Sequence, residues 1–331
     1  MKKYLSMITA AIVLSSPVLA NSSKECKSYQ SGIIEGQINC KRMSDADLEK
    51  WSGLQSVTGG LTIEGINITN LKPLDDMKYI GGTFSFTVKG KKDFINLQGM
   101  NGLLEVGTKG LDIDRRFLGM NPLKIAGSGG IRVYDTYKLE TISGFNAVNK
   151  IGGGISISKN RKLNTISGFN ELTDVGGHIQ IGNNSKKLNI TGFNKLENVG
   201  GGIFISQVDD ISFLSNLKTV GDELGLSQNR ITNIDVLKSL TKVGGALKLD
   251  NNDIKDLNGL INLKHVGKNL TLGGNKNIQD ISVLKNIKFI GGKVSFHRKD
   301  YKIKLPNDSY ICQNSKLSDI SNWRNYCEPA K

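Results

Sequence analysis

The sequence IGGGISISKNRKLNTISGFNEL, residues 151–172, is followed almost at once by VGGHIQIGNNSKKLNITGFNKL, residues 175–196, with the same order of residue types. A shortened copy, VGGALKLDNNDIKDLNGLINL, occupies residues 243–263. Each copy has a glycine turn, a short segment of alternating apolar and polar residues, an asparagine, and apolar residues at intervals of three. Self-similarity at a fixed period predicts a solenoid, in which each unit becomes stable by stacking on its neighbours.

The repeat extends through nearly the whole chain. The first apolar residues of the expected strands are Leu61, Phe84, Leu111, Ile131, Ile155, Ile179, Ile203, Leu224, Leu247, Leu270 and Val294. Most steps are 21 to 24 residues long, with one of 27 and one of 20 on either side of Leu111. We therefore expect a β-rich solenoid, coiled to the right, of about eleven 20–27-residue repeats whose strands form one long parallel sheet.

An asparagine recurs three residues after the second apolar residue of the strand. The members of this set are Asn160, Asn184, Asn229, Asn252 and Asn275. Because they share one repeat position, we expect an inward-facing ladder of amides that hydrogen-bond the backbone of neighbouring coils, instead of asparagines in surface loops.

The apolar residues after the asparagine are spaced by three. One such run is Leu163, Ile166, Phe169, Leu172 and Val175. On a regular α-helix, five residues at this spacing would be distributed around most of the helix, so one helix could not bury them all on one side. The spacing predicts a return path of 3₁₀ turns, bends and short extended pieces.

The N-terminus has the features of a secretory signal. Lys2 and Lys3 precede an apolar stretch that ends in the small-residue pattern at Ala20. A membrane anchor is the alternative, but the stretch is short and broken by Ser and Pro. We expect a mature chain exported to the periplasm or the extracellular space, with no membrane span. Its expected parts are the signal at 1–20, an N-terminal cap at 21–56, the solenoid at 57–304 and a C-terminal cap at 305–331.

All four cysteines lie outside the repeats. We expect Cys26 to pair with Cys40 and Cys312 with Cys327, because a long solenoid holds its ends too far apart for the crossed pairings. Metal binding is the rival interpretation, but no CxxC is present and the chain has three histidines. We expect disulfides, no metal and no cofactor. Short capping helices are expected over residues 44–54, with Ser44 as N-cap, and over residues 318–326.

The string L-x-x-V-G-G-x-I-x-I-x-x-N-x-x-L-x-x-I-x-G-F-x-x-L resembles the leucine-rich-repeat-like receptor L domains. It is still more similar to the repeats of fungal GPI-anchored cell-wall organisation proteins, although no Ser/Thr-rich stalk or hydrophobic tail follows and the Met-Lys-Lys start looks bacterial. The resemblance covers about residues 54–304. It implies a recognition role at a cell envelope and supplies no catalytic residues.

The chain is basic, with a net charge of +14. Residues 181–331 carry 22 basic against 14 acidic residues, so the excess lies mainly in the C-terminal half. The electrostatic field of this positive charge favours anionic partners, such as an acidic glycan or an acidic protein surface. We expect no nucleic-acid partner, because no nucleic-acid-binding motif accompanies the charge.

Two candidate sites follow from the repeat register. Asp112, Asp114, Arg132 and Tyr134 are expected on neighbouring exposed strand positions, either as a ligand site or as a solvated salt pair. Lys218, Lys242, Lys264 and Lys288 precede successive glycine turns and are expected to form either an anion-binding patch or a solvated basic face.

Neither candidate site predicts catalysis. Two carboxylates for glycan cleavage would need different environments, and nothing in the sequence raises the pKa of Asp112 or Asp114. We therefore expect a non-enzymatic recognition module for a protein or an anionic glycan. The alternatives are a structural or adhesive surface protein and, third, a carbohydrate-active β-helix enzyme.

Overall fold

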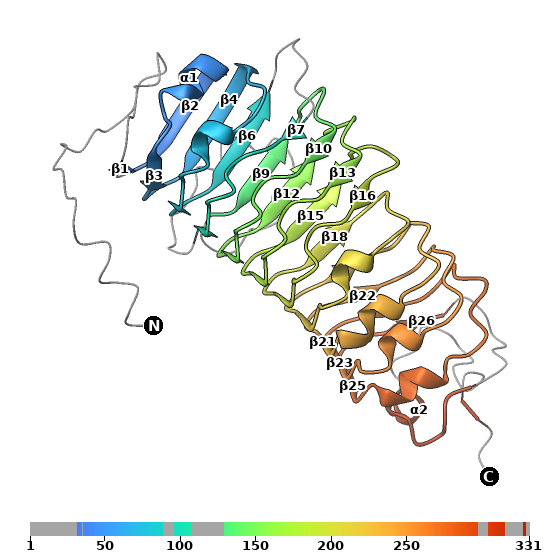
Figure 1. Cartoon of the computed structure of the whole chain (residues 1–331). Helices are drawn as coiled ribbons and strands as arrows, with labels where there is room; N and C mark the ends of the chain where they lie inside the picture. Colours follow the sequence, from blue (N-terminus) through green and yellow to red (C-terminus); the bar gives the residue numbers. More distant parts are fainter. Residues whose placement is uncertain are drawn as a thin grey trace, which may run out of the picture.

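The computed structural model describes residues 32–34, 36–88, 96–107, 129–296, 304–314 and 327–328. They form an elongated parallel β-solenoid, with the first and last coils at opposite ends of the molecule (Figure 1). Ile155, Ile179 and Ile203 are direct register partners on neighbouring strands. The stacking predicted from the repeat is therefore confirmed.

Each coil contributes one strand to each of two long parallel sheets. Sheet A has the order β1 (Gly32–Ile34), β3 (Leu54–Val57), β5 (Tyr79–Ile80), β8 (Glu105–Val106), β11 (Lys150–Ile151), β14 (Asp174–Val175), β17 (Asn198–Val199), β19 (Thr219–Val220), β21 (Lys242–Val243), β23 (His265–Val266) and β25 (Phe289–Ile290). Sheet B has the order β2 (Ile38–Ser44), β4 (Leu61–Asn67), β6 (Phe84–Val88), β9 (Ile131–Tyr134), β12 (Ile155–Ser158), β15 (Ile179–Gly182), β18 (Ile203–Ile205), β20 (Leu224–Gly225), β22 (Leu247–Lys248), β24 (Leu270–Thr271) and β26 (Val294–Ser295).

The return path differs among the coils. The middle coils form a third sheet, with the order β16 (Asn189–Ile190), β13 (Thr165–Ile166), β10 (Thr141–Ile142) and β7 (Asn96–Leu97). Other coils use 3₁₀ turns: η1 (Lys72–Leu74), η3 (Ser212–Leu214), η4 (Asp235–Ser239), η5 (Asn258–Leu260) and η6 (Ser282–Asn286). The predicted return path of 3₁₀ turns and short extended pieces is confirmed. The predicted long parallel sheet is confirmed as sheet B, and the structure adds sheet A, which has as many strands among the described residues.

One coil carries a large insertion. β6 pairs directly with β9, with Phe84 opposite Ile131, so the strand predicted at Leu111 does not lie between them. The extra strand of sheet B is instead β2, which pairs with β4 at the N-terminal end. A Cβ atom on Gly107 would overlap the carbonyl group of Gly129. Gly107 and Gly129 therefore lie side by side in one glycine turn, and residues 108–128 between them, which include Leu111, lie outside the described residues.

The core is a continuous apolar column. All five residues of the run from Leu163 to Val175 that was predicted to be buried have at most 1% of their surface exposed. Phe145, Phe169 and Phe193 stack with ring centroids 5.2 and 4.8 Å apart. Each of these phenylalanines has a positive φ of 62 to 64°. This left-handed backbone is uncommon for a bulky residue and turns the ring into the core.

The asparagine ladder is confirmed, because all five predicted members are buried. The Nδ2 of Asn184 donates to the carbonyl of Ile157 at 2.9 Å, and its Oδ1 accepts from the amide of Asn160 at 3.1 Å. Each asparagine thus satisfies backbone groups of the preceding coil that are shielded from water.

The predicted capping helices are confirmed in part. Ser44 is the N-cap of α1 (Asp45–Glu49), and the Asp47 carboxylate accepts from its amide and hydroxyl. The helix is shorter than predicted: it ends at Glu49, and Leu54 belongs to β3. A second helix, α2 (Tyr310–Gln313), precedes the predicted one at residues 318–326, which lies outside the described residues.

The predicted disulfide between Cys312 and Cys327 is confirmed, with their Cα atoms 6.0 Å apart. Cys40 is also disulfide-bonded. Its predicted partner, Cys26, lies outside the described residues.

Candidate ligand-binding face

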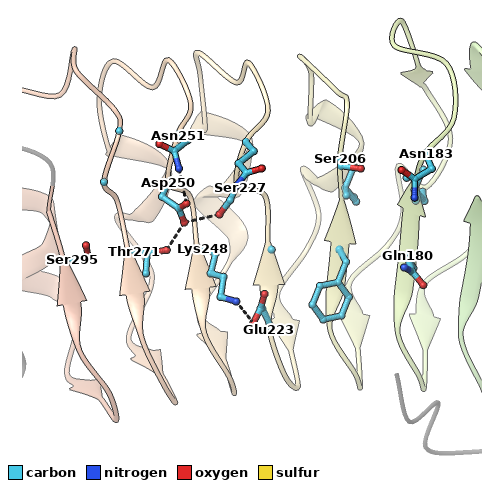
Figure 2. Close-up of a pocket in the computed structure, with 18 residues that line it drawn as sticks. Gln180, Asn183, Ser206, Glu223, Ser227, Lys248, Asp250, Asn251, Thr271 and Ser295 are labelled. Atoms are coloured by element: carbon cyan, nitrogen blue, oxygen red, sulfur yellow. Dashed lines mark hydrogen bonds and ion pairs between the residues drawn. The ribbon is translucent and has the colours of Figure 1, made fainter. Parts of the chain in front are cut away.

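A groove crosses the exposed face of sheet B in the C-terminal half (Figure 2). It has a volume of about 800 Å³ and spans the coils of β15 to β26. One exposed residue per strand forms its floor: Gln180, Phe204, Gly225, Lys248, Thr271 and Ser295. The register that stacks the core therefore also aligns these side chains in a row that runs across the strands.

Phe204 is the one aromatic residue in this floor, and its neighbour on β20 is Gly225. A Cβ atom on Gly225 would lie 3.3 Å from Cδ1 of Phe204. Because glycine has no side chain, the ring can lie close to the backbone of β20, and Phe204 remains partly exposed. On the other side, the ring of His178 lies 5.8 Å away between centroids. Phe204 thus offers a supported apolar surface of the kind that packs against the C–H face of a sugar ring.

Asp250 is the polar centre of the groove. One of its oxygens, Oδ1, accepts hydrogen bonds from Ser227 Oγ at 2.6 Å and Thr271 Oγ1 at 2.7 Å, and Oδ2 accepts from Asn251 Nδ2 at 3.0 Å (Figure 2). Partial burial raises the pKa of Asp250, but the hydrogen bonds from Ser227 and Thr271 outweigh it, and the pKa lies below its ordinary value. The carboxylate is therefore ionised at neutral pH.

An ion pair borders the floor beside Gly225. Lys248 Nζ lies 2.9 Å from Oε2 of Glu223 on the neighbouring coil (Figure 2). Both side chains are partly exposed, so the pair contributes little to stability. It does fix two long side chains at the edge of the groove, where each keeps hydrogen-bonding capacity for a ligand.

A smaller polar hollow adjoins the groove and shares Asn183 with it. It has a volume of about 440 Å³ and is lined by Asp135, Lys159, Arg161, Asn183, Asn184 and Gln207. Arg161 is exposed, and no ion pair or hydrogen bond of its side chain occurs among the described residues. The Oε1 atom of Gln207 is buried without a hydrogen-bond partner within that same part of the chain. Two cations and an unsatisfied amide therefore surround the hollow.

One of the predicted site residues, Tyr134, contacts a residue that lines this hollow. Tyr134 Oη accepts a hydrogen bond from Lys159 Nζ at 2.7 Å, and the same ammonium lies 5.1 Å from the centre of the tyrosine ring. Arg132, on the same strand, has Ser85 and Ser156 as register partners. Burial lowers the pKa of Arg132, because a shielded guanidinium loses hydration.

Asp112 and Asp114 were expected beside Arg132 and Tyr134. Both lie outside the described residues. β9 pairs with β6 and β12, so no strand that carries Asp112 and Asp114 lies directly beside it, and the grouping of these carboxylates with Arg132 and Tyr134 stays a prediction.

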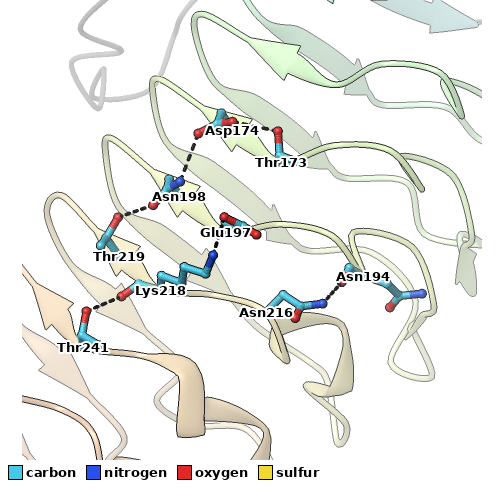
Figure 3. A network of polar contacts seen from close by, with 9 residues as sticks. All are labelled: Thr173, Asp174, Asn194, Glu197, Asn198, Asn216, Lys218, Thr219 and Thr241. Atoms are coloured by element: carbon cyan, nitrogen blue, oxygen red, sulfur yellow. Dashed lines mark hydrogen bonds and ion pairs between the residues drawn. The ribbon is translucent and has the colours of Figure 1, made fainter.

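The predicted lysine row lies along sheet A. Lys218 is neutralised by Glu197, whose Oε2 is 2.7 Å from its Nζ (Figure 3). No ion pair of Lys242, Lys264 or Lys288 occurs among the described residues. These three remain exposed cations at the C-terminal end of the sheet.

Further toward the N-terminus, polar side chains along sheet A form hydrogen bonds with one another. Asn198 Nδ2 donates to Asp174 Oδ1 at 3.1 Å, and Thr219 Oγ1 donates to Asn198 Oδ1 at 2.8 Å (Figure 3). Thr173 Oγ1 completes the row with a hydrogen bond to Asp174 Oδ2 at 2.7 Å. These polar groups already have partners within the chain, which makes this stretch a weaker candidate for ligand binding than the groove.

Within the described ranges, no three His, Cys, Asp or Glu residues come together as a set of metal ligands. None of the helices described is of a length and apolar character that could cross a membrane. In comparisons with known proteins, neither a protein-family model nor a curated protein matches the chain.

Proposed function

We propose that the chain is an exported, non-enzymatic recognition module that binds an acidic polysaccharide in the groove of sheet B. The observation that carries this proposal is the aligned row from Gln180 to Ser295, with Phe204 as an apolar platform and the cationic hollow beside it. A protein ligand and a purely structural role are the competing outcomes of the test below.

The shape of the groove favours a polymer of similar units. Neighbouring strands of a sheet are about 4.8 Å apart, so the groove presents polar side chains at a regular interval across the coils. Ser, Thr, Asn, Gln, Asp and Lys all occur in its lining. Such side chains match the hydroxyl groups of a sugar, which both donate and accept hydrogen bonds. The groove therefore suits an extended glycan strand that lies across the coils.

The adjoining hollow favours a negative charge on that glycan. Lys159 and Arg161 outnumber Asp135, and the amides of Asn183 and Gln207 supply further hydrogen-bonding groups. A planar guanidinium binds carboxylate and phosphate oxygens in a bidentate manner. The ionised group of an acidic sugar unit would lie here while neighbouring units occupy the groove near Asn183.

The carboxylate in the groove is unsuited to acid catalysis. A general acid needs a raised pKa so that it carries a proton at neutral pH. The pKa of Asp250 is instead lowered, and three side chains hold its oxygens. Glu223 is paired with Lys248. These contacts support binding over hydrolysis.

The proposed location rests on the sequence of the first twenty residues, with a basic start, an apolar stretch and small residues at the end. The disulfide at Cys312 and Cys327 supports it, because disulfides persist in oxidising compartments. We place the protein in the periplasm or outside the cell.

An array of acidic and neutral glycans, probed with the purified protein, tests this proposal. We expect binding to acidic members, and roughly tenfold weaker binding when Lys159→Gln and Arg161→Gln are combined. The matched control combines Lys186→Gln and Lys187→Gln, two exposed lysines outside the hollow, and should leave affinity unchanged. An array without any bound acidic glycan would overturn the proposal and favour a protein ligand or a structural role.

A further inference from the structure

A row of cationic and aromatic side chains runs along sheet A in the last coils, on a different sheet from the groove. Lys242, His265 and Phe289 are register partners on β21, β23 and β25. Lys264 and Lys288 precede His265 and Phe289 directly. We call these five residues the basic edge.

The lysines of the basic edge are not neutralised. Lys242, Lys264 and Lys288 are all exposed, and no ion pair is found for any of them in the part of the chain that is described. Lys238, by contrast, lies 3.0 Å from an Asp235 oxygen. Three unpaired ammonium groups on consecutive coils produce a positive field in front of this edge.

Phe289 gives the basic edge an apolar component. Its side chain is 42% exposed although it is large and apolar. Its ring stacks on His265, with centroids 4.7 Å apart and planes 12° apart, and Tyr310 of α2 lies 6.1 Å away. His265 covers one face of the ring and Tyr310 lies near it, so only part of the ring is exposed. A ring covered on one face offers less area for stacking on a sugar, but its exposed part can enter an apolar layer.

We propose that the basic edge docks the C-terminal coils onto an anionic lipid surface. The ammonium groups of Lys242, Lys264 and Lys288 would lie against headgroup phosphates, and the rim of Phe289 would enter the interface between headgroups and acyl chains. Aromatic side chains favour that interface because one part of the ring is apolar while its neighbours stay hydrated. This docking is independent of glycan binding, because the two surfaces belong to different sheets.

Co-sedimentation of the purified protein with vesicles tests the docking. One set of vesicles contains phosphatidylglycerol and phosphatidylcholine, and the other contains phosphatidylcholine alone. We expect binding to the first set only. Combined Lys264→Gln and Lys288→Gln should weaken binding roughly thirtyfold at low salt. Phe289→Ser should weaken it at low and high salt alike, because burial of apolar surface is not screened by salt.

Two matched variants serve as controls. Leu104→Ser changes another apolar side chain that is 45% exposed. The pair Lys186→Gln and Lys187→Gln removes the same charge from exposed positions elsewhere. Neither should change vesicle binding.

Three outcomes would overturn the docking: no binding to anionic vesicles, equal binding to both vesicle sets, or equal losses in the controls. The docking would also be overturned if the protein bound soluble dextran sulfate more tightly than anionic vesicles and if Phe289→Ser left that binding unchanged. Such a result would assign the basic edge to a soluble polyanion.

Discussion

The backbone amide of Asn160 donates to the side-chain oxygen of Asn184 on the next coil, and Asn184 donates to the carbonyl of Ile157 on the coil before it. Each ladder asparagine therefore links two coils through its single side chain. The row is interrupted once, at the buried Val208, whose amide donates to Asn229 Oδ1 at 3.1 Å.

Asn229→Val should destabilise the protein by about 1–3 kcal/mol, because the carbonyl of Ile205 and the amide of Val208 lose their partner in a buried place. Urea unfolding measures this cost. The reverse change, Val208→Asn, places an amide in the gap of the ladder and should be neutral or stabilising. Equal losses in both variants would contradict the role given to the ladder.

Phe204→Ala should weaken glycan binding tenfold or more while the melting temperature stays nearly constant, because the ring is partly exposed and lies in the groove. Isothermal titration with a glycan identified on the array measures the affinity. Phe289→Ala, which removes an exposed ring outside the groove, should bind as the unmodified protein does. A loss in Phe289→Ala of the same size would mean that the groove is not the site.

Deletion of residues 108–128 should leave a folded solenoid. Gly107 and Gly129 lie side by side, and joining them recreates a glycine turn like the one between Ile151 and Ile155. We expect a change of a few degrees at most in the melting temperature. The same variant tests Asp112 and Asp114, because their contribution to ligand binding disappears with the segment. A variant that fails to fold would refute the description of this segment as an insertion.

The stability contributed by Asp250 should depend on pH in a defined direction. Its folded-state pKa lies below the ordinary aspartate value, so ionised Asp250 stabilises the folded state above the unfolded-state pKa, and this stability is lost as the pH falls through the folded-state pKa. The difference in unfolding free energy between the unmodified protein and Asp250→Asn should therefore be largest at neutral pH and shrink below about pH 4. Asp253→Asn, a change at an exposed position, should show no such trend. A difference that is the same at pH 7 and pH 3 would count against the hydrogen-bonded carboxylate.

Much of the fold could be predicted from the sequence because the repeat position fixes the environment of a residue. The strands of sheet B, the buried run from Leu163 to Val175 and the ladder asparagines each recur at one position, so a few copies define the rest. Sheet A was missed for a physical reason. A strand such as Lys150–Ile151 is only two residues long, and two residues show no alternation.

The candidate site was less predictable. Tyr134 contacts Lys159 of the polar hollow. The position of the Phe204 ring depends on Gly225, which is distant in sequence and adjacent in register. The outward-facing column of sheet B contains both residues, yet the sequence does not show how closely the ring packs against its neighbour.

By itself, the sequence determined that this chain is a stack of coils, which residues face the core, and where the asparagines bind, because periodicity alone assigns those environments. Only the tertiary structure decided that β6 lies directly beside β9, that Asp250 is held by Ser227 and Thr271, and that a groove forms over β15 to β26. These features depend on contacts between coils 21 to 24 residues apart, and such contacts are set by the register in which the coils stack.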